Sequence, residues 1–161
     1  MIVRLAALLT LASALTGAPA VVGAADRADT AGSEVARRGT VLTAPEAAAR
    51  AAAGTLALVD VRAPREWRET GIAKGAHPVS IHNPDGIKAF VADLARAVNG
   101  DRAAPIALIC ASGVRSLRAQ RILLANGFTN IKNVPEGMLG RPGAGPGWLK
   151  RGLPVSPCPE C

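Results

Sequence analysis

The segment that determines the fold is Pro105-Ile106-Ala107-Leu108-Ile109-Cys110-Ala111-Ser112-Gly113-Val114-Arg115-Ser116. Its first five residues form an apolar run, which is typical of a strand buried on both faces of a parallel sheet. Residues 110–115 follow as a predicted short loop. Because serine commonly caps helices, we predict a helix from Ser116 to Asn126, with Gly127 just beyond its end.

The flanking segments repeat this alternation of strand and helix. Residues 56–59 form a second apolar run, and weaker strand candidates cover residues 76–81 and 129–134. Helical patterns cover residues 64–69 and 84–98, and a capping box at Thr43-Ala44-Pro45-Glu46 begins a helix that Gly54 ends. The alternation predicts a three-layer α/β domain, in which helices flank a central parallel sheet.

The loop after residue 109 combines three features that suit sulfur chemistry. The dipole and unpaired first-turn N–H groups of the following helix stabilise a thiolate at Cys110 and raise its nucleophilicity. Gly113 allows backbone N–H groups to converge on an anion, and Arg115 offers a guanidinium that can bind two oxygen atoms. We therefore take Cys110 as the candidate nucleophile and Ala111, Ser112, Gly113, Val114 and Arg115 as the anion-binding loop. The alternative is a buried structural cysteine before an ordinary helix.

The spacing within this loop separates two enzyme classes. Tyrosine-phosphatase-type sites have five residues between their cysteine and arginine, whereas four residues separate Cys110 from Arg115. The smaller ring suits a terminal sulfur atom on the cysteine better than a tetrahedral phosphate.

At this point the sequence resembles the rhodanese (thiosulfate sulfurtransferase) family from about Val41 to Val155. The matching stretches are Leu58-Val59-Asp60-Val61-Arg62, Glu66-Trp67, Thr70-Gly71-Ile72, Gly75-Ala76, 109–116, Gly127-Phe128, Asn133-Val134, Glu136-Gly137-Met138, Trp148 and Gly152-Leu153-Pro154-Val155. The resemblance implies an α/β fold with a central parallel sheet. It also implies that Cys110 carries sulfur as a persulfide, cradled by the N–H groups of residues 111–115. Arg115 would stabilise the loop or bind an oxyanion.

The resemblance implies an enzyme that needs no metal or cofactor. It would move sulfane sulfur from thiosulfate or a related small anion to a thiol, cyanide or a protein cysteine. The sequence departs from the family at Ala111, where many members have a charged or polar residue that tunes the choice of donor. Two alternatives remain open: an exported thiol–disulfide redox protein that uses Cys158 and Cys161, and a non-catalytic binding module with the same fold.

Three further groups of residues are candidates for supporting roles. Asp60 follows a predicted strand and would hold the loop or Arg62 in place, or simply cap the turn.

Residues 40–155 would form the rhodanese-like domain, and residues 156–161 a tail that contains Cys158-Pro159-Glu160-Cys161. This spacing allows a disulfide, a redox dithiol or half of a zinc site. Arg118 and Arg121 share one face of the predicted helix, where they would raise the local potential for anionic donors, although a solvated face is the default interpretation.

Residues 1–25 are expected to be a secretory signal peptide, cleaved near Ala20 to Ala25, and residues 26–39 a tether of low order. The apolar run 5–16 is shorter than the ~20 residues of a bilayer span, so we expect a periplasmic or secreted protein with no stable membrane insertion after processing. An uncleaved anchor is the alternative.

The composition of the 161 residues restricts the function classes. Hydrophobic residues make up 49% of the chain and charged residues 19%, which argues against general disorder. The net charge of +7 comes from scattered basic residues, and aromatic residues make up only 2% of the chain. Neither property indicates nucleic-acid binding. The odd number of cysteines, three, leaves at least one thiol outside a disulfide.

Overall fold

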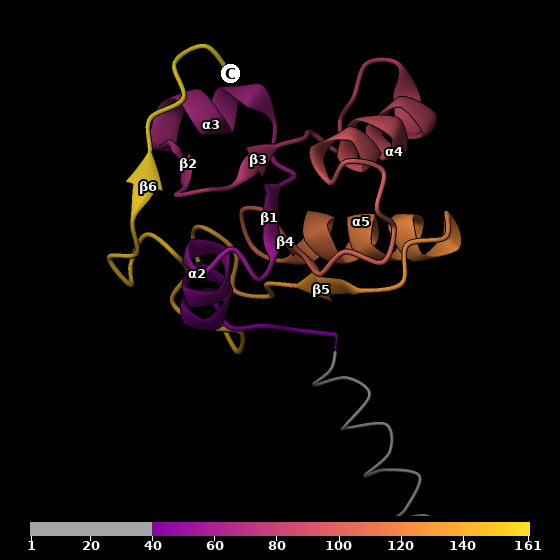
Figure 1. The fold of residues 1–161 in the computed structure, drawn as a ribbon. Coiled ribbons are helices and arrows are strands. Elements are labelled where there is room, and N and C mark those ends of the chain that lie inside the picture. Colours follow the sequence, from indigo (N-terminus) through magenta and orange to yellow (C-terminus); the bar gives the residue numbers. More distant parts are fainter. Residues whose placement is uncertain (1–39) are drawn as a thin grey trace, which may run out of the picture.

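The computed structural model describes residues 40–161 as an α/β domain (Figure 1). The predicted signal peptide and tether lie outside the described residues. The helices are α2 (Ala44–Ala52), α3 (Pro64–Thr70), α4 (Gly86–Ala97) and α5 (Val114–Ala125). The strands are β1 (Ala57–Asp60), β2 (Ile72–Ala73), β3 (His77–Pro78), β4 (Ile106–Ile109), β5 (Ile131–Asn133) and β6 (Val155–Ser156). Within this range, no helix is long and apolar enough to cross a membrane.

The central sheet has the strand order β3-β1-β4-β5, and all of its pairs are parallel. The predicted fold class is therefore confirmed. Asp60 at the end of β1 lies opposite Ile109 at the end of β4, so Asp60 and Cys110 stand at the same edge of the sheet. The strand predicted over residues 76–81 is reduced to His77–Pro78, although the N–H groups of Val79 and Ile81 still donate to the carbonyl oxygens of Asp60 and Val61 at 3.0 and 3.3 Å.

Helices cover both faces of this sheet, and each face has its own hydrophobic core. Successive strand side chains point to opposite faces, so Val59 and Leu108 pack in one core while Leu58 and Ile109 pack in the other. The first core is completed by side chains of α4 and α5, namely Phe90, Leu94, Ala119 and Leu123. The second is completed by α2 and the C-terminal part of the domain through Ala44, Ala47, Met138 and Trp148.

A second, two-stranded sheet attaches the C-terminal segment to the domain. Strands β2 and β6 pair antiparallel, although the sequence analysis assigned no strand to either segment. The backbone N–H of Lys74 also donates to the carbonyl oxygen of Pro154 at 3.0 Å. Gly71 permits this close approach, since a Cβ atom there would lie 2.7 Å from the Ser156 carbonyl oxygen.

Candidate active site

The helix that follows Cys110 begins earlier than the sequence analysis predicted. Gly113 is the N-cap residue, with φ of 82°, and α5 begins at Val114. The prediction that Ser116 caps this helix was wrong, because a glycine in the left-handed conformation turns the chain into the helix without a capping side chain. Ser116 instead lies buried in the first turn, where its hydroxyl faces the cysteine.

Cys110 is a buried free thiol, only 1% exposed. Its Sγ accepts hydrogen bonds from the backbone N–H of Gly113 at 3.2 Å and from the hydroxyl of Ser116 at 3.3 Å. It also lies at the N-terminal end of α5, where the helix dipole is positive. Donors and dipole all favour negative charge on this sulfur, so the pocket is suited to a thiolate or to a negatively charged sulfur atom attached to it.

A turn formed by residues 135–139 packs against the loop and hydrogen-bonds to its backbone. The N–H groups of Met138 and Leu139 donate to the carbonyl oxygens of Cys110 and Ala111 at 2.8 and 2.9 Å. The packing is so close that a Cβ atom on Gly113 would lie 2.1 Å from the Pro135 carbonyl oxygen. The loop backbone is therefore preorganised, and this turn includes the stretch Glu136-Gly137-Met138 that the sequence analysis singled out.

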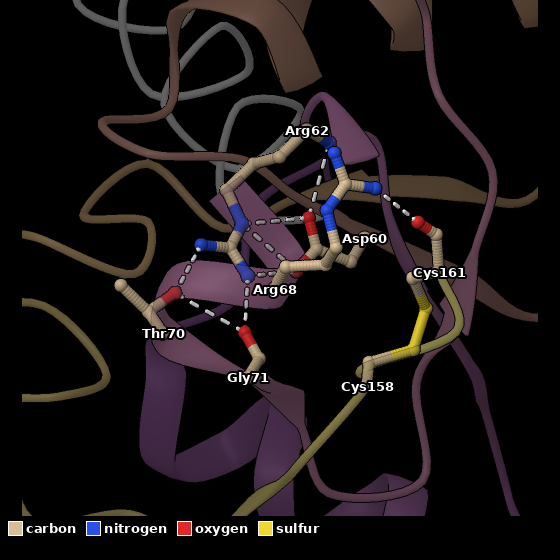
Figure 2. The surroundings of a disulfide bond; sticks show 7 residues. All are labelled: Asp60, Arg62, Arg68, Thr70, Gly71, Cys158 and Cys161. Carbon is tan, nitrogen blue, oxygen red and sulfur yellow. Dashed lines mark hydrogen bonds and ion pairs between the residues drawn. A yellow bond between two sulfur atoms is a disulfide. The ribbon is translucent and has the colours of Figure 1, made fainter. Parts of the chain in front are cut away.

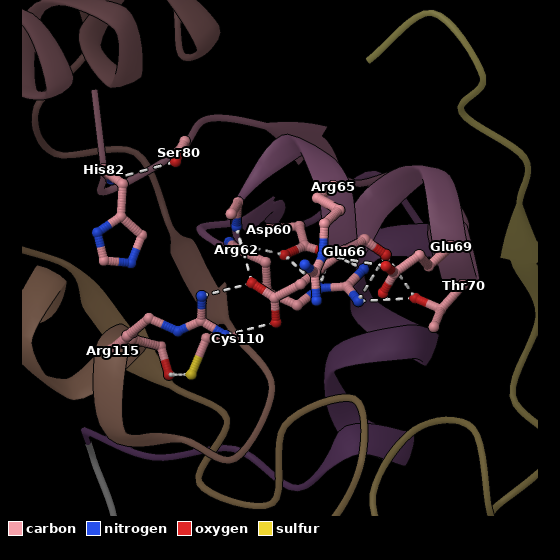
Figure 3. A network of polar contacts seen from close by, with 12 residues as sticks. Asp60, Arg62, Arg65, Glu66, Glu69, Thr70, Ser80, His82, Cys110 and Arg115 are labelled. Carbon is pink, nitrogen blue, oxygen red and sulfur yellow. Dashed lines mark hydrogen bonds and ion pairs between the residues drawn. The ribbon is translucent and has the colours of Figure 1, made fainter. Parts of the chain in front are cut away.

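Arg115 is held by a carboxylate on a neighbouring helix (Figure 3). Its two terminal nitrogens donate to the two carboxylate oxygens of Glu66 at 2.5 and 2.6 Å. The hydrogen bonds from Arg115, and a further one from the N–H of Ala63, outweigh partial burial and lower the pKa of Glu66. Of the two roles that the resemblance implied for Arg115, this geometry favours stabilisation of the loop.

The role of Glu66 was missed by sequence reasoning. It was quoted only within a matching stretch, because its partner lies 49 residues away along the chain. One signal was present: a carboxylate in the first turn of a predicted helix beside a sheet edge that also carries a predicted anion-binding arginine.

Asp60 and Arg62 form a buried ion pair that fixes α3 to the end of β1 (Figure 2). The Arg62 guanidinium donates to the Asp60 carboxylate at 2.7 to 3.0 Å. It also donates to the Thr70 hydroxyl and the Gly71 carbonyl oxygen, both at 2.7 Å. The pair thus holds the C-terminal end of α3 against the sheet, which in turn fixes the position of Glu66.

Cys158 and Cys161 form a disulfide in the structure. The Arg68 guanidinium donates to the carbonyl oxygen of Cys161 at 2.5 Å (Figure 2). Arg68 and Glu66 are two residues apart on α3 and therefore project about 200° apart around the helix axis. In Figure 3, Cys110 and the C-terminal strand accordingly lie on opposite sides of α3. The structure does not bring the two sulfur sites together.

Comparisons with known proteins show which family and which solved structures this chain is similar to. The family model of the Rhodanese-like domain matches residues 43–140. The chain is similar to the polysulfide-sulfur transferase homodimer from Wolinella succinogenes, with 25% identity, coverage of 81% of this chain and 88% of that chain, and a TM-score of 0.55. It is also similar to the human single-domain sulfurtransferase TSTD1, with 25% identity, coverage of 69% and 96%, and a TM-score of 0.51. A further similar structure, Rv0390 from M. tuberculosis, has 28% identity, coverage of 74% and 98%, and a TM-score of 0.57. No curated protein sequence matches the chain.

Proposed function

The chain belongs to the rhodanese-like domain family, and from that premise we propose that it is a sulfurtransferase that carries sulfane sulfur as a persulfide on Cys110. The observation that carries the proposal is the environment of the Cys110 sulfur. Two hydrogen-bond donors and a helix N-terminus converge on it in a loop whose backbone is fixed from behind. An inert buried cysteine requires none of these groups.

The reaction has two displacement steps. The Cys110 thiolate attacks the outer sulfur of a donor such as thiosulfate, the bond between the two donor sulfurs breaks, and sulfite leaves with the electron pair. A thiolate or cyanide acceptor then attacks the outer sulfur of the Cys110 persulfide. The bond to Cys110 breaks, the acceptor gains the sulfur, and the Cys110 thiolate is regenerated. These steps predict double-displacement kinetics.

The loop residues contribute to both steps. The N–H of Gly113 already donates to the Cys110 sulfur, and on this proposal the other N–H groups of Ala111 to Arg115 would surround the outer sulfur, since those in the first turn of a helix have no partner within it. They stabilise the negative charge that the persulfide carries. Arg115 keeps the loop closed through its bond to Glu66, while Asp60 and Arg62 support α3.

Mass spectrometry tests the assignment of the sulfur carrier. After incubation with thiosulfate, and in parallel with a polysulfide donor, Cys110 is expected to gain one sulfur atom and to lose it when cyanide is added. The variant Cys158→Ser/Cys161→Ser should still gain this sulfur, and the matched variant Cys110→Ser should not. Full sulfur-transfer activity in Cys110→Ser would overturn the proposal.

The disulfide supports a second candidate function, thiol–disulfide exchange at Cys158 and Cys161. A pocket of about 330 Å³ lies between the tail and the end of α3, and Cys158 lines it. In this case a partner dithiol would reduce the disulfide and itself become oxidised. If Cys110 gains no sulfur from either donor while the tail cycles between disulfide and dithiol, this second function replaces the first.

We also propose that residues 1–25 direct export, which would place the domain in the periplasm or outside the cell. A disulfide between Cys158 and Cys161 suits an oxidising compartment. Mass measurement of the exported protein checks this, and the expected new N-terminus follows Ala20, Ala24 or Ala25. A protein that retains Met1 and stays in the membrane fraction would contradict it.

A further inference from the structure

Charge is distributed unevenly along the domain. Residues 40–101 contain seven acidic and seven basic side chains, whereas residues 102–161 contain eight basic and two acidic ones. One of these two, Glu136, is buried and bound to Arg151. The part of the chain that carries Cys110 and α5 therefore presents almost only positive charge to solvent.

The exposed side of α5 combines this positive charge with large apolar side chains. We call it the α5 face, and it consists of Val114, Leu117, Arg118, Arg121 and Leu124. At 100° per residue, these side chains fall within about 120° of the helix circumference. Val114, Leu117 and Leu124 are 58%, 38% and 44% exposed. An amphipathic surface helix normally turns its apolar side chains inward, so this outward set requires an explanation.

The α5 face begins at the site itself. Val114 belongs to the anion-binding loop, four residues after Cys110. On another border of the loop lies Leu139, which is 49% exposed and whose backbone N–H binds the Ala111 carbonyl oxygen. Exposed apolar side chains from two different elements therefore flank a buried sulfur atom.

We propose that the acceptor of the Cys110 sulfur is an acidic protein that docks on the α5 face and presents a cysteine thiolate to the loop. The inference rests on the proposed function and specifies its acceptor. Arg118 and Arg121 would attract the partner's carboxylates, and Val114, Leu117 and Leu139 would contact apolar side chains around its cysteine. The partner's thiolate attacks the outer sulfur of the persulfide, the bond to Cys110 breaks, and the Cys110 thiolate is restored.

Two other occupants fit the α5 face less well. A second copy of this chain, packed face to face around a twofold axis, would bring the Arg118 and Arg121 side chains of both copies together. A nucleic acid would find cations for its phosphates, but the four aromatic side chains among the described residues, Trp67, Phe90, Phe128 and Trp148, are all buried. None of them is placed to stack on a base, and exposed leucines gain nothing from a phosphate backbone.

Two synthetic peptides test the inference on the purified protein. Both carry one central cysteine and two leucines, and one is flanked by glutamates, the other by lysines. Sulfur transfer from persulfidated Cys110 to each peptide is measured relative to transfer to 2-mercaptoethanol, a neutral thiol. We expect the glutamate peptide to accept sulfur at least tenfold faster than the lysine peptide at low salt. The difference should shrink in about 1 M salt, where the Debye length is about 3 Å.

The variant Arg118→Glu/Arg121→Glu should abolish or invert this preference. The matched control is Arg50→Glu/Lys74→Glu, which makes the same change in net charge on the side of the sheet that α2 covers. The control should retain the preference for the glutamate peptide. Because the peptide comparison and its salt dependence are measured on the unaltered protein, the test stands even if a variant fails to fold.

The outcomes separate this inference from the proposed function. If Cys110 never gains a sulfur, the proposed function itself fails. If Cys110 is loaded and transfers sulfur to 2-mercaptoethanol, but both peptides react equally or both double variants behave alike, only the docking inference is overturned. It is also overturned if Arg118→Glu/Arg121→Glu converts a dimer into a monomer in sedimentation, or if an oligothymidine binds through these arginines while the peptides are not distinguished.

Discussion

Arg115 and Glu66 show how a single contact influences the chemistry of the loop. The arginine is already bound on two nitrogens before any donor arrives, so the carboxylate balances much of its charge. A doubly charged donor such as the proposed thiosulfate would therefore meet a weaker attraction than the arginine alone would exert. The same contact makes the loop more rigid, because it joins α3 directly to the start of α5. The loop thus gains rigidity while Arg115 attracts anions less strongly.

The variant Glu66→Gln should lower stability near neutral pH by about 1 kcal/mol, the upper range for a partly exposed ion pair. The hydrogen bonds from Arg115 hold the pKa of Glu66 below its ordinary value of 4.5. The contribution of the pair is thus complete above about pH 4.5 and is lost as pH falls through the lowered pKa of the folded state. Thermal unfolding from neutral to strongly acidic pH should show the two proteins converge in acid.

The control for this variant is Glu69→Gln, which removes the partner of Arg65 from an exposed pair on the same helix. Its effect should be smaller than that of Glu66→Gln near neutral pH, because the Arg65–Glu69 pair is more exposed than the Arg115–Glu66 pair. A difference between Glu66→Gln and the unaltered protein that stays constant into strong acid would contradict an electrostatic role for the pair.

Among the elements, the buried strands and the loop were predictable because hydrophobic runs and glycine positions are local signals. Strand β4 and the loop after it lie where the apolar run of residues 106–109 placed them. The start of α5 was not predicted correctly, because Ser116 offers a side-chain acceptor that suits an N-cap, whereas the chain turns into the helix earlier, at Gly113, which has no side chain. Strands β2 and β6 were missed because two residues are too few to show an alternating pattern.

Gly113→Ala should damage the loop more than an alanine at another glycine with the same backbone angle. Gly75 has φ of 79°, and a Cβ atom added there would meet nothing within 4 Å, so Gly75→Ala measures backbone strain alone, about 1 kcal/mol. Gly113→Ala adds a clash with Pro135 and should cost roughly 1–3 kcal/mol more. Urea unfolding measures both costs.

The rate of sulfur loading on Cys110 provides the second readout for this pair of variants. Gly113→Ala should load slowly, because its N–H can no longer keep its place beside the sulfur. Gly75→Ala should load at the rate of the unaltered protein. Equal rates in both variants would show that the exact path of the loop backbone does not matter for the reaction.

At the scale of the whole molecule, contacts between distant segments position the site, and these were beyond sequence reasoning. Glu136 accepts hydrogen bonds from the N–H groups of Ala44 and Gly147 and from Arg151, although Ala44 lies 92 residues away. It thus joins the start of α2 to the C-terminal part of the domain from within the turn that supports the loop. No pattern within a single sequence pairs residues at such separations.

Glu136→Gln should destabilise the domain by about 2–4 kcal/mol, because it weakens three hydrogen bonds and leaves Arg151 without its charge partner. Burial raises the pKa of Glu136, but the bonds from Arg151, Ala44 and Gly147 lower it by more, so the net shift is downward. Its contribution should therefore persist above about pH 4.5 and decline in stronger acid. Urea unfolding at several pH values checks this, and an effect no larger than that of Glu69→Gln would contradict it.

Helix α3 lies between the Cys158–Cys161 disulfide and Cys110 and therefore separates the two sulfur sites (Figure 3). If the tail were reduced, a free thiol that reached a Cys110 persulfide in the same molecule would take its outer sulfur. The persulfide would then be lost before an acceptor from outside could react with it. With Glu66 facing one sulfur site and Arg68 the other, the helix keeps them out of each other's reach. Under the proposed function, the Cys110 persulfide and the tail disulfide would therefore react independently, each with a reagent from outside the molecule.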